Sequence, residues 1–404
     1  MEQFLPFFLI LLAGVFFSEV FRRFNLPWVI ALLLAGVVIG PHAAGFIELD
    51  ETLSFIGQIG LVFLMFMAGI ETKITPVRGM RTRVIFFSLV NSFIPFVVGV
   101  GLTVFLGFSI QAALLVGIIF ISSSLSVVVP TLTQVGLINN RMGHLIVPSA
   151  VLQDVLSLAV LSIVFQAVDP ISSLPLPLFY LILFSSLFLL RWVVPKIETL
   201  MTQRYVDKAD IFQQQLRMVL TLMIGTVIIF ELLGLHPIIA GFFAGLILSD
   251  TIKGDYFKEK LRAVSYGVFI PVFFVITGAR TDVSVFFEAG RALALTALIV
   301  TGSIIAKFGS GWLAARAIGE KGIDATLVAS ATIPQLTTTL AVITIGIELG
   351  LLTPSLVTGL ITLSIVTTIV SPLLLNALAA ERSKLWEQYL AKTQDPDQIA
   401  EPTV

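Results

Sequence analysis

Long apolar runs, separated by short polar stretches and Pro/Gly-rich turns, fill almost the whole 404-residue chain. A helix that spans a bilayer needs about 20 mostly apolar residues, because hydrocarbon offers no partner to backbone polar groups. The breaks divide the chain into about thirteen such segments. We therefore predict an all-α polytopic membrane protein with helices near residues 3–21, 26–41, 55–71, 84–106, 111–136, 143–168, 174–195, 216–234, 237–250, 264–280, 291–316, 323–349 and 354–380.

Composition agrees with this class. The chain is 57% hydrophobic and 12% charged, with a mean hydropathy of +1.03, whereas soluble domains average about 25% charged residues. The net charge of −1 gives no sign of nucleic-acid binding, and the lack of cysteine excludes disulfides and Cys-based metal sites. We expect the lipid bilayer as surroundings, no nucleic-acid partner, no resident metal and no cofactor.

Basic residues predict the orientation. With the N-terminus outside, 21 of the 24 Lys and Arg residues fall in loops, or in the tail, on the cytoplasmic side. The positive-inside rule requires this bias. The exceptions are Arg280 and Arg291, in outer loops, and Lys307, inside an apolar segment. We therefore expect a prokaryotic inner-membrane protein with its C-terminus in the cytoplasm.

Sequence similarity recurs at an offset of 209 residues. If a single linker helix separates two six-helix copies, the second copy is inverted in the membrane, as in many secondary transporters. We predict a first repeat at 1–173, a linker helix and cytoplasmic loop at 174–215, a second, inverted repeat at 216–380 and a cytoplasmic polar tail at 381–404. The matching residues are Leu26, Ile30, Ala31, Ala35, Gly36 and Gly69 with Leu235, Ile239, Ala240, Ala244, Gly245 and Gly278.

The fifth helix of each predicted repeat is rich in hydroxyl side chains and contains a proline, in ISSSLSVVVPTLTQ and SATIPQLTTTL. Proline removes a backbone donor and clashes with the preceding turn. Interrupted helices at corresponding places in two repeats mark the binding site of many transporters. We expect both helices to be unwound near the bilayer midplane and to cross there.

Two charged residues lie deep in apolar segments. Asp154 is about 20 Å along its helix from Arg141, and Lys307 is roughly 14 Å from Arg316. A charge at the bilayer centre costs about 2.5–3.5 kcal/mol, so Asp154 should face a wet cavity, pair with a cation or be protonated part of the time, and a group that binds and releases protons can exchange them for another cation. Lys307 has two open roles: an ion pair with Asp154 that an entering cation displaces, or neutralisation of the C-terminal ends of broken half-helices.

The ordered motifs resemble the membrane domain of the second cation:proton antiporter family, which includes bacterial sodium/proton antiporters and Kef-type potassium efflux antiporters. The resemblance covers about residues 5–380. It implies the sodium/proton antiporter fold: an inverted repeat with a dimerisation domain, a core domain built around two crossing broken helices, and a homodimer. The motifs are LPWVIALLLAGVVIGPH, IGQIGLVFLMFMAGIE, ISSSLSVVVPTL, VLQDVLSL, IIAGFFAGLILS, IPVFFVITGARTD and AKFGSGWLAAR.

The resemblance also implies roles for individual residues. Asp154 is the expected ion- and proton-carrying carboxylate, and Lys307 matches the family's core lysine. Gln153 stands where electrogenic sodium exchangers of the family carry a second aspartate, as it does in Kef-type antiporters. Kef systems continue into a nucleotide-binding domain, whereas this chain ends at Val404 after a polar tail. We therefore expect no gating by glutathione or nucleotide.

These features predict a secondary antiporter, not an enzyme, that exchanges a monovalent cation, Na+ or K+, for protons by alternating access. Cation and proton would compete for Asp154, with Gln153, the hydroxyls of Ser123 and Ser124, and carbonyls near Thr332 completing the site. The alternative is a potassium channel on the same fold, although no TVGYG-like filter is present. An intramembrane protease would need a second deep aspartate or a mid-helix histidine, and the sequence offers neither.

Overall fold

The computed structural model describes residues 4–23, 28–71, 80–168, 214–233, 235–249, 255–281 and 290–392, and a few isolated positions between 178 and 196. Every regular element among these residues is a helix, which confirms the predicted all-α class. Among the described residues, eight helical stretches are long and apolar enough to cross a membrane, and four apolar helices are shorter.

Helices occur in twelve of the predicted segments, whereas 174–195 falls largely outside the described residues. The number of membrane crossings therefore stays a prediction. The last helix continues well past residue 380, into the predicted tail. In chain order the helices are α1 (Phe4–Arg22), α2 (Trp28–Ile39), α3 (Glu51–Glu71), α4 (Arg81–Phe105), α5 (Ile110–Ile121), α6 (Leu125–Gln134), α7 (Arg141–Val168), α9 (Gln214–Leu232), α10 (Pro237–Leu248), α11 (Asp255–Val264), η1 (Ser265–Phe269), α12 (Ile270–Ala279), α13 (Gly290–Ala317), α14 (Gly322–Ala331), α15 (Thr337–Glu348) and α16 (Pro354–Lys392).

The chain forms two compact units, each assembled from segments that are far apart in the sequence. Each unit contains helices from both predicted repeats, so the repeats at 1–173 and 216–380 are not the compact bodies of the fold. Unit 1 comprises Met1–Phe24, Ala31–Lys73 and Ser162–Arg280, and unit 2 comprises Asn25–Ile30, Ile74–Leu161 and Thr281–Val404.

In unit 1, glycines allow close approach of helices at positions related by the 209-residue offset. A Cβ atom on Gly36 of α2 would lie 1.9 Å from the carbonyl oxygen of Val275 on α12. A Cβ atom on Gly245 of α10 would lie 2.1 Å from the carbonyl oxygen of Phe66 on α3. The offset of 209 residues converts Gly36 into Gly245 and Phe66 into Val275, so the two contacts join equivalent positions of the two predicted repeats. This equivalence supports the predicted repeat, whereas the inverted orientation of the second copy stays a prediction. The same offset relates the contact of Gly69 with the Phe242 carbonyl to the contact of Gly278 with the Leu33 carbonyl.

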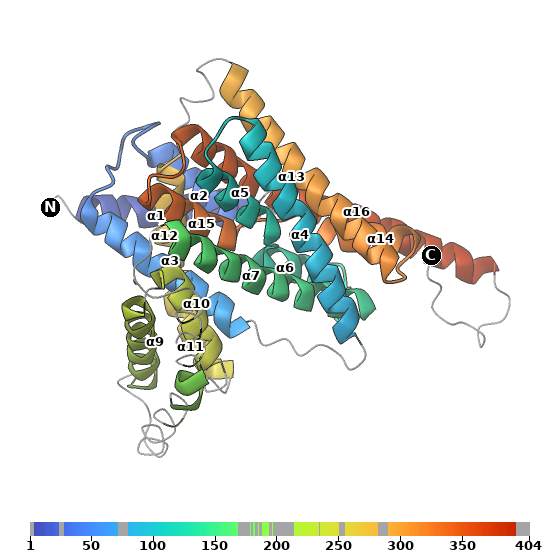
Figure 1. Ribbon diagram of the computed structural model, residues 1–404, viewed down its shortest axis with the longest axis horizontal. Coiled ribbons are helices and arrows are strands. Elements are labelled where there is room, and N and C mark those ends of the chain that lie inside the picture. The colour runs from blue at the N-terminus through green and yellow to red at the C-terminus, as the bar shows by residue number, and fades with distance from the viewer. Residues whose placement is uncertain are drawn as a thin grey trace. The chain divides into compact units, whose positions relative to one another are not determined.

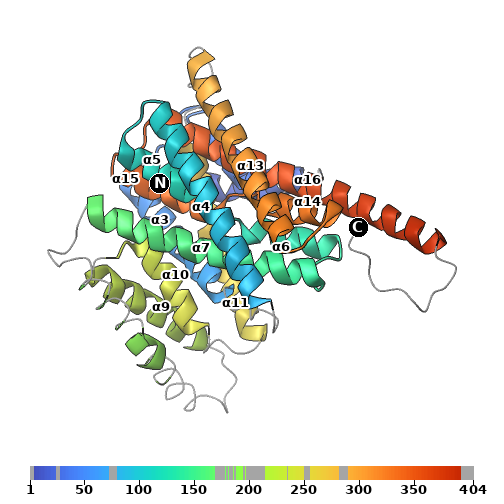
Figure 2. The ribbon, with the colours of Figure 1, turned by 45° about the vertical axis from the view of Figure 1, so that its right-hand side comes forward.

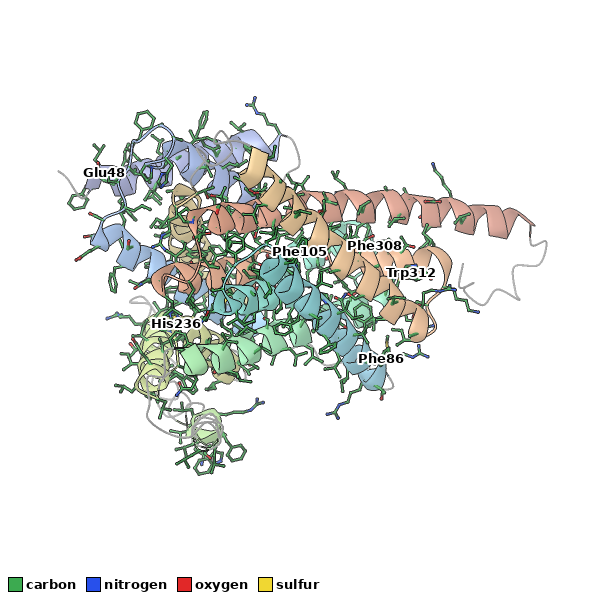
Figure 3. The ribbon with its side chains drawn as sticks, turned by 45° about the horizontal axis from the view of Figure 1, so that its top comes forward. Glu48, Phe86, Phe105, His236, Phe308 and Trp312 are labelled. Carbon is green, nitrogen blue, oxygen red and sulfur yellow. The ribbon has the colours of Figure 1, made fainter. Side chains whose placement is uncertain are left out.

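Unit 2 contains α4, α5, α6, most of α7, and α13 to α16. Helix α13 lies alongside α4 and also packs against α14 and α16 (Figures 1 and 2). Phe86 and Phe105 lie toward opposite ends of α4 (Figure 3), and their side chains are exposed. Helix α4 is one of the apolar helices long enough to cross a membrane, and exposed aromatic side chains on such a helix are consistent with a surface in contact with lipid.

Two helices of unit 2 are interrupted, as predicted. The first breaks between Ile121, the end of α5, and Leu125, the start of α6; the second breaks between Ala331 and Thr337, at the junction of α14 and α15. Pro334 lies within the second break. In contrast, Pro130 lies inside α6, so the first break does not coincide with a proline.

The serine run explains the position of the first break. Ser122 and Ser124 are extended, with ψ angles of 155° and 108°. The Ser124 N–H donates to the Pro334 carbonyl at 2.7 Å, and Ser123 Oγ donates to the Thr332 carbonyl at 2.9 Å. The two unwound segments therefore lie against each other and satisfy each other's polar groups. Serine side chains compete well with helical hydrogen bonds, so this run can leave the helix without a proline.

The glycine contacts predict a stability effect. In Gly245→Ala, the added methyl group would collide with the Phe66 carbonyl on α3. Overpacking of this kind costs about 1–3 kcal/mol, and we expect the melting temperature in detergent, followed by size-exclusion chromatography, to fall by several degrees. Gly225→Ala on α9 is the matched control, because no heavy atom lies within 4 Å of its Cβ position. Equal melting temperatures for the two variants would contradict the packing of α10 on α3.

Candidate functional site

The predicted site residues all belong to unit 2 and all are buried. Gln153 and Asp154 lie on α7, Lys307 lies on α13, and the remaining residues lie at the two helix breaks. Lys307 is 0% exposed and Asp154 is 7% exposed. Helix α7 continues from Arg141 past Asp154, so about 20 Å of helix separates the two residues, and the depth of the carboxylate in the membrane stays a prediction.

Gln153 joins the first break to α13. Its Oε1 atom accepts hydrogen bonds from Ser123 Oγ at 2.8 Å and from Lys307 Nζ at 2.9 Å. Because a lysine ammonium can only donate, the amide must turn its oxygen toward Lys307. The Nε2 atom of Gln153 is buried and has no partner among the described residues. Three of the residues predicted from sequence, Ser123, Gln153 and Lys307, thus form one hydrogen-bonded group.

The Lys307 ammonium is surrounded by oxygen acceptors. Besides Gln153, Nζ donates to the carbonyl oxygens of Ile121 at 2.8 Å and of Asn91 at 3.3 Å. Ile121 is the last residue of α5, where the helix dipole leaves partial negative charge on carbonyls that lack helical partners. Within the described part of the chain, no ion pair joins Lys307 to Asp154. This geometry favours the second predicted role, neutralisation of a half-helix end.

Asp154 lies at the N-terminal end of a half-helix, whereas Lys307 lies at a C-terminal end. Its Oδ1 atom accepts a hydrogen bond of 3.1 Å from Thr338 Oγ1. Thr338 is in the first turn of α15, where backbone N–H groups carry partial positive charge. The site therefore places a cationic side chain at the C-terminal end of one half-helix and a carboxylate at the N-terminal end of another.

Thr332 and Ser124 have different surroundings. The Thr332 carbonyl accepts from Ser123, and the single hydrogen of its Oγ1 atom is shared between the carbonyls of Ala329 at 2.8 Å and of Lys307 at 3.1 Å. The Ser124 hydroxyl pairs instead with Ser126 Oγ at 2.9 Å. No hydrogen bond among the described residues links Ser124 to Gln153 or Asp154. Thr332 thus joins the network, whereas Ser124 belongs to the backbone of the break.

Several polar residues that sequence reasoning did not assign to the site complete this network. Gln335 Nε2 donates to the Phe120 carbonyl near the end of α5 at 3.4 Å, and Ser371 Oγ donates to the Ser330 carbonyl near the end of α14 at 2.8 Å. They join Asn91 and Thr338. Asn91 and Ser371 are polar residues within apolar segments, whereas Gln335 and Thr338 belong to the hydroxyl-rich run SATIPQLTTTL. Because buried polar groups need hydrogen-bond partners, their polarity is the signal that could have identified all four.

Two ion pairs hold the other end of α14. Arg141, the first residue of α7, lies 2.9 Å from Glu320, and Arg382 of α16 lies 2.8 Å from Asp324 in the first turn of α14. The predicted topology places Arg141, the loop at 317–321 and the start of the tail on the same side of the membrane. These contacts within unit 2 agree with that arrangement.

The network predicts an effect of Ser123 on stability. Ser123→Ala removes the hydroxyl whose single hydrogen lies between two acceptors, Gln153 Oε1 at 2.8 Å and the Thr332 carbonyl at 2.9 Å, and leaves both buried acceptors without that donor. We expect the free energy of unfolding to fall by about 1–3 kcal/mol, measured as a lower melting temperature in detergent. Ser126→Ala is the control, because Ser126 is exposed and its side chain pairs with the Ser124 hydroxyl rather than with Gln153 or Thr332. If Ser123→Ala melts at the same temperature as Ser126→Ala, the network does not support the break.

Comparison with known proteins identifies the family. Residues 7–381 match the family described as "Sodium/hydrogen exchanger, transmembrane". The chain is 30% identical over 373 residues to the Na(+)/H(+) antiporter of Enterococcus hirae, covering 91% of this chain and 95% of that protein. It is 28% identical over 356 residues to the "Probable Na(+)/H(+) antiporter 3" of Methanocaldococcus jannaschii, covering 87% and 90%. It is also 28% identical over 354 residues to the Na(+)/H(+)-K(+) antiporter GerN of Bacillus cereus, covering 87% and 89%.

A solved structure supports the fold. The chain is similar to the sodium proton antiporter MjNhaP1 from Methanocaldococcus jannaschii at pH 8, with a TM-score of 0.69 over 94% of this chain and 99% of that one, at 17% identity. This likeness confirms the helical sodium/proton antiporter fold as a whole, while the number of crossings, the inverted repeat and the homodimer stay predictions. The matched family is a different branch from the second cation:proton antiporter family and its Kef-type members, but the exchanger part of the resemblance holds. Its relatives are transporters rather than enzymes. The chain thus belongs to the sodium/hydrogen exchanger family of integral membrane proteins.

Proposed function

We propose that this protein is a secondary antiporter that exchanges Na+ or K+ for protons across a prokaryotic inner membrane by alternating access. The observation that carries this proposal is the buried carboxylate of Asp154, hydrogen-bonded to Thr338 where two interrupted helices meet. The relatives named Na(+)/H(+) antiporters support proton-coupled sodium exchange. GerN, named a Na(+)/H(+)-K(+) antiporter, supports potassium as a second candidate ion.

Asp154 can carry either ion because its two protonation states offer different chemistry. The ionised carboxylate is an acceptor whose oxygens suit a hard cation, whereas the protonated form is neutral and has one O–H donor. Both ions need the same oxygens, so binding of one releases the other. The Thr338 hydroxyl can rotate to serve either state: it donates to the bare carboxylate and offers a lone pair to a bound cation.

The remaining ligands surround the same break. The Thr332 carbonyl has one lone pair left after it accepts from Ser123, and the Ser124 hydroxyl stays a further candidate. Gln153 Oε1 already accepts two hydrogen bonds in this conformation. It could coordinate a cation only after Ser123 or Lys307 has turned away. We therefore assign Gln153 first to holding Lys307 and only second to the cation.

Lys307 acts as a fixed positive charge in this proposal. All three ammonium hydrogens have oxygen acceptors, and a neutral amine could not fill all of them. The charge offsets the partial negative charge at the end of α5. Asp154 then carries the proton alone, and the exchange is one proton for one cation.

A channel on the same fold is the weaker candidate. The named relatives are antiporters, and the side chains of Ser123, Gln153 and Lys307 occupy the break and bond to one another in the described conformation. A passive cation path would need those contacts to open without a proton moving in the other direction.

The exchange proposal predicts a loss of transport in Asp154→Asn. The amide keeps the shape of the carboxylate but cannot bind a proton reversibly, so exchange should fall to the rate of protein-free liposomes. Proteoliposomes with an internal pH-sensitive dye would measure this, with sodium, potassium and lithium titrated separately. Glu231→Gln, at an exposed position on α9, is the control and should exchange like the wild type. Wild-type exchange by Asp154→Asn, or cation flux that needs no opposing proton, would refute the proposal.

We propose that unit 2 is the moving core, because it contains every residue of the site. Unit 1 would form the dimerisation domain of a homodimer. The sequence division into a first repeat at 1–173, a linker at 174–215 and a second repeat at 216–380 supports alternating access, because exchange of conformation between two inverted copies opens the site to opposite sides.

The proposed orientation can be tested because the chain contains no cysteine. Glu48, labelled in Figure 3, is exposed in the segment after α2, and Lys384 is exposed on α16. In intact cells, a membrane-impermeant maleimide should label Glu48→Cys, whereas Lys384→Cys should react only after the cells are permeabilised. The opposite labelling pattern would reverse the orientation without affecting the exchange mechanism.

A further inference from the structure

Asn91 and Lys307 hold each other across two helices. Asn91 is fully buried on α4, and its Nδ2 atom donates to the Lys307 carbonyl oxygen at 2.8 Å and to Ser310 Oγ at 2.8 Å. In return, Lys307 Nζ donates to the Asn91 carbonyl at 3.3 Å. The side chain of each residue thus bonds to the main chain of the other. Helix propensity or apolar packing alone does not call for an asparagine here.

The second broken helix joins the same contact. Thr332 Oγ1 also donates to the Lys307 carbonyl, at 3.1 Å. A Cβ atom on Gly311 would lie 3.0 Å from Thr332 Oγ1 and 3.2 Å from Asn91 Nδ2, so glycine at this position leaves the space that both polar groups occupy. We call Asn91, Lys307, Ser310, Gly311 and Thr332 the α4–α13 clasp. The clasp fixes the main chain of α13 at the residue that carries the buried ammonium.

We propose that Asn91 is a positioning residue of the exchange reaction. By holding the Lys307 main chain, it directs the ammonium onto the Ile121 carbonyl and Gln153, and thereby away from Asp154. This inference rests on the exchange function proposed above and adds a residue to it. Asn91 does not touch the cation; it acts only through Lys307.

An amide suits this role because it presents two N–H donors in one plane. One of them reaches the Lys307 carbonyl, which lies in the middle of the continuous helix α13, and the other reaches the Ser310 hydroxyl about one turn further along the same helix. Without the amide, the Lys307 carbonyl loses its shortest side-chain hydrogen bond, and the hydroxyls of Thr332, at 3.1 Å, and of Ser310, at 3.3 Å, are the side-chain donors that remain near it. The lysine is then less restrained, and its ammonium can turn toward Asp154 and compete with the transported cation for the carboxylate.

The test compares the effect of an Asn91 substitution on the KM for the cation with its effect on the maximal exchange rate. In proteoliposomes, Asn91→Ala should raise the KM for Na+, with K+ assayed in parallel, about threefold to tenfold, the range of one lost hydrogen bond. The maximal rate should change less. Ser92→Ala is the control, because Ser92 is the next residue on α4, is also buried, and its Oγ has no partner among the described residues. Its KM should match the wild type.

A second measurement separates positioning from a general structural role. Stabilisation of the detergent-solubilised protein by added NaCl reports cation binding even in variants that do not transport. Asn91→Ala should shift this titration to higher NaCl in the wild-type background but not in a Lys307→Gln background, because the two residues act together. A structural role would lower the melting temperature equally in both backgrounds and leave the NaCl titration unshifted.

The outcomes are distinct. If the wild type exchanges ions and Asn91→Ala behaves like Ser92→Ala, the positioning role is wrong and the exchange proposal stands. An equal shift of the NaCl titration in the Lys307→Gln background also overturns the positioning role. If Asn91→Ala does not fold, Ser310→Ala decides, because it removes the second acceptor of the Asn91 amide. Its KM should then rise about twofold or more, and an unchanged KM would refute the inference.

Discussion

Unwinding two helices inside an apolar interior is the constraint on which unit 2 depends. Each break leaves carbonyl and amide groups without helical partners, and an unsatisfied polar group in such surroundings costs several kcal/mol. The structure meets this cost with side chains from α13, from α16 and from the second break itself. Lys307 and Gln335 donate hydrogen bonds to carbonyls at the end of α5, and Ser371 donates one to a carbonyl near the end of α14. The break segments also bond to each other through Ser124.

The same constraint generates the chemistry. A half-helix that ends in the interior presents partial negative charge, and one that begins there presents partial positive charge. Lys307 lies at the C-terminal end of α5, and Asp154 lies at the N-terminal end of α15. The partial charges of these helix ends therefore stabilise the two side chains separately, rather than the two side chains stabilising only each other. A carboxylate held in this way is available to an incoming cation or proton. Structural support and ion exchange therefore use the same groups.

The sequence predicted the helical segments, the two interrupted helices and the two deep charges, because apolar length, hydroxyl-rich runs and buried charge are strong local signals. It did not predict that the first break would fall at Ser122–Ser124 rather than near Pro130, since this depends on Ser123 reaching Gln153 and Thr332 across the fold. For the same reason it left the role of Lys307 open. Asn91 was not assigned to the site because the role of one polar residue in an apolar helix depends on its partner, which the sequence does not show. Thr338 lies in the hydroxyl-rich run of the second interrupted helix, but its contact with Asp154 forms only across the fold.

The central claim is that cation and proton compete for Asp154 while Lys307 keeps its charge. The most direct test is to count protons released when Na+ or K+ binds to the detergent-solubilised protein, by calorimetry in buffers of different ionisation enthalpy. We expect one proton released for each cation bound, and none in Asp154→Asn. Binding without proton release, or release of two protons per cation, would contradict the account.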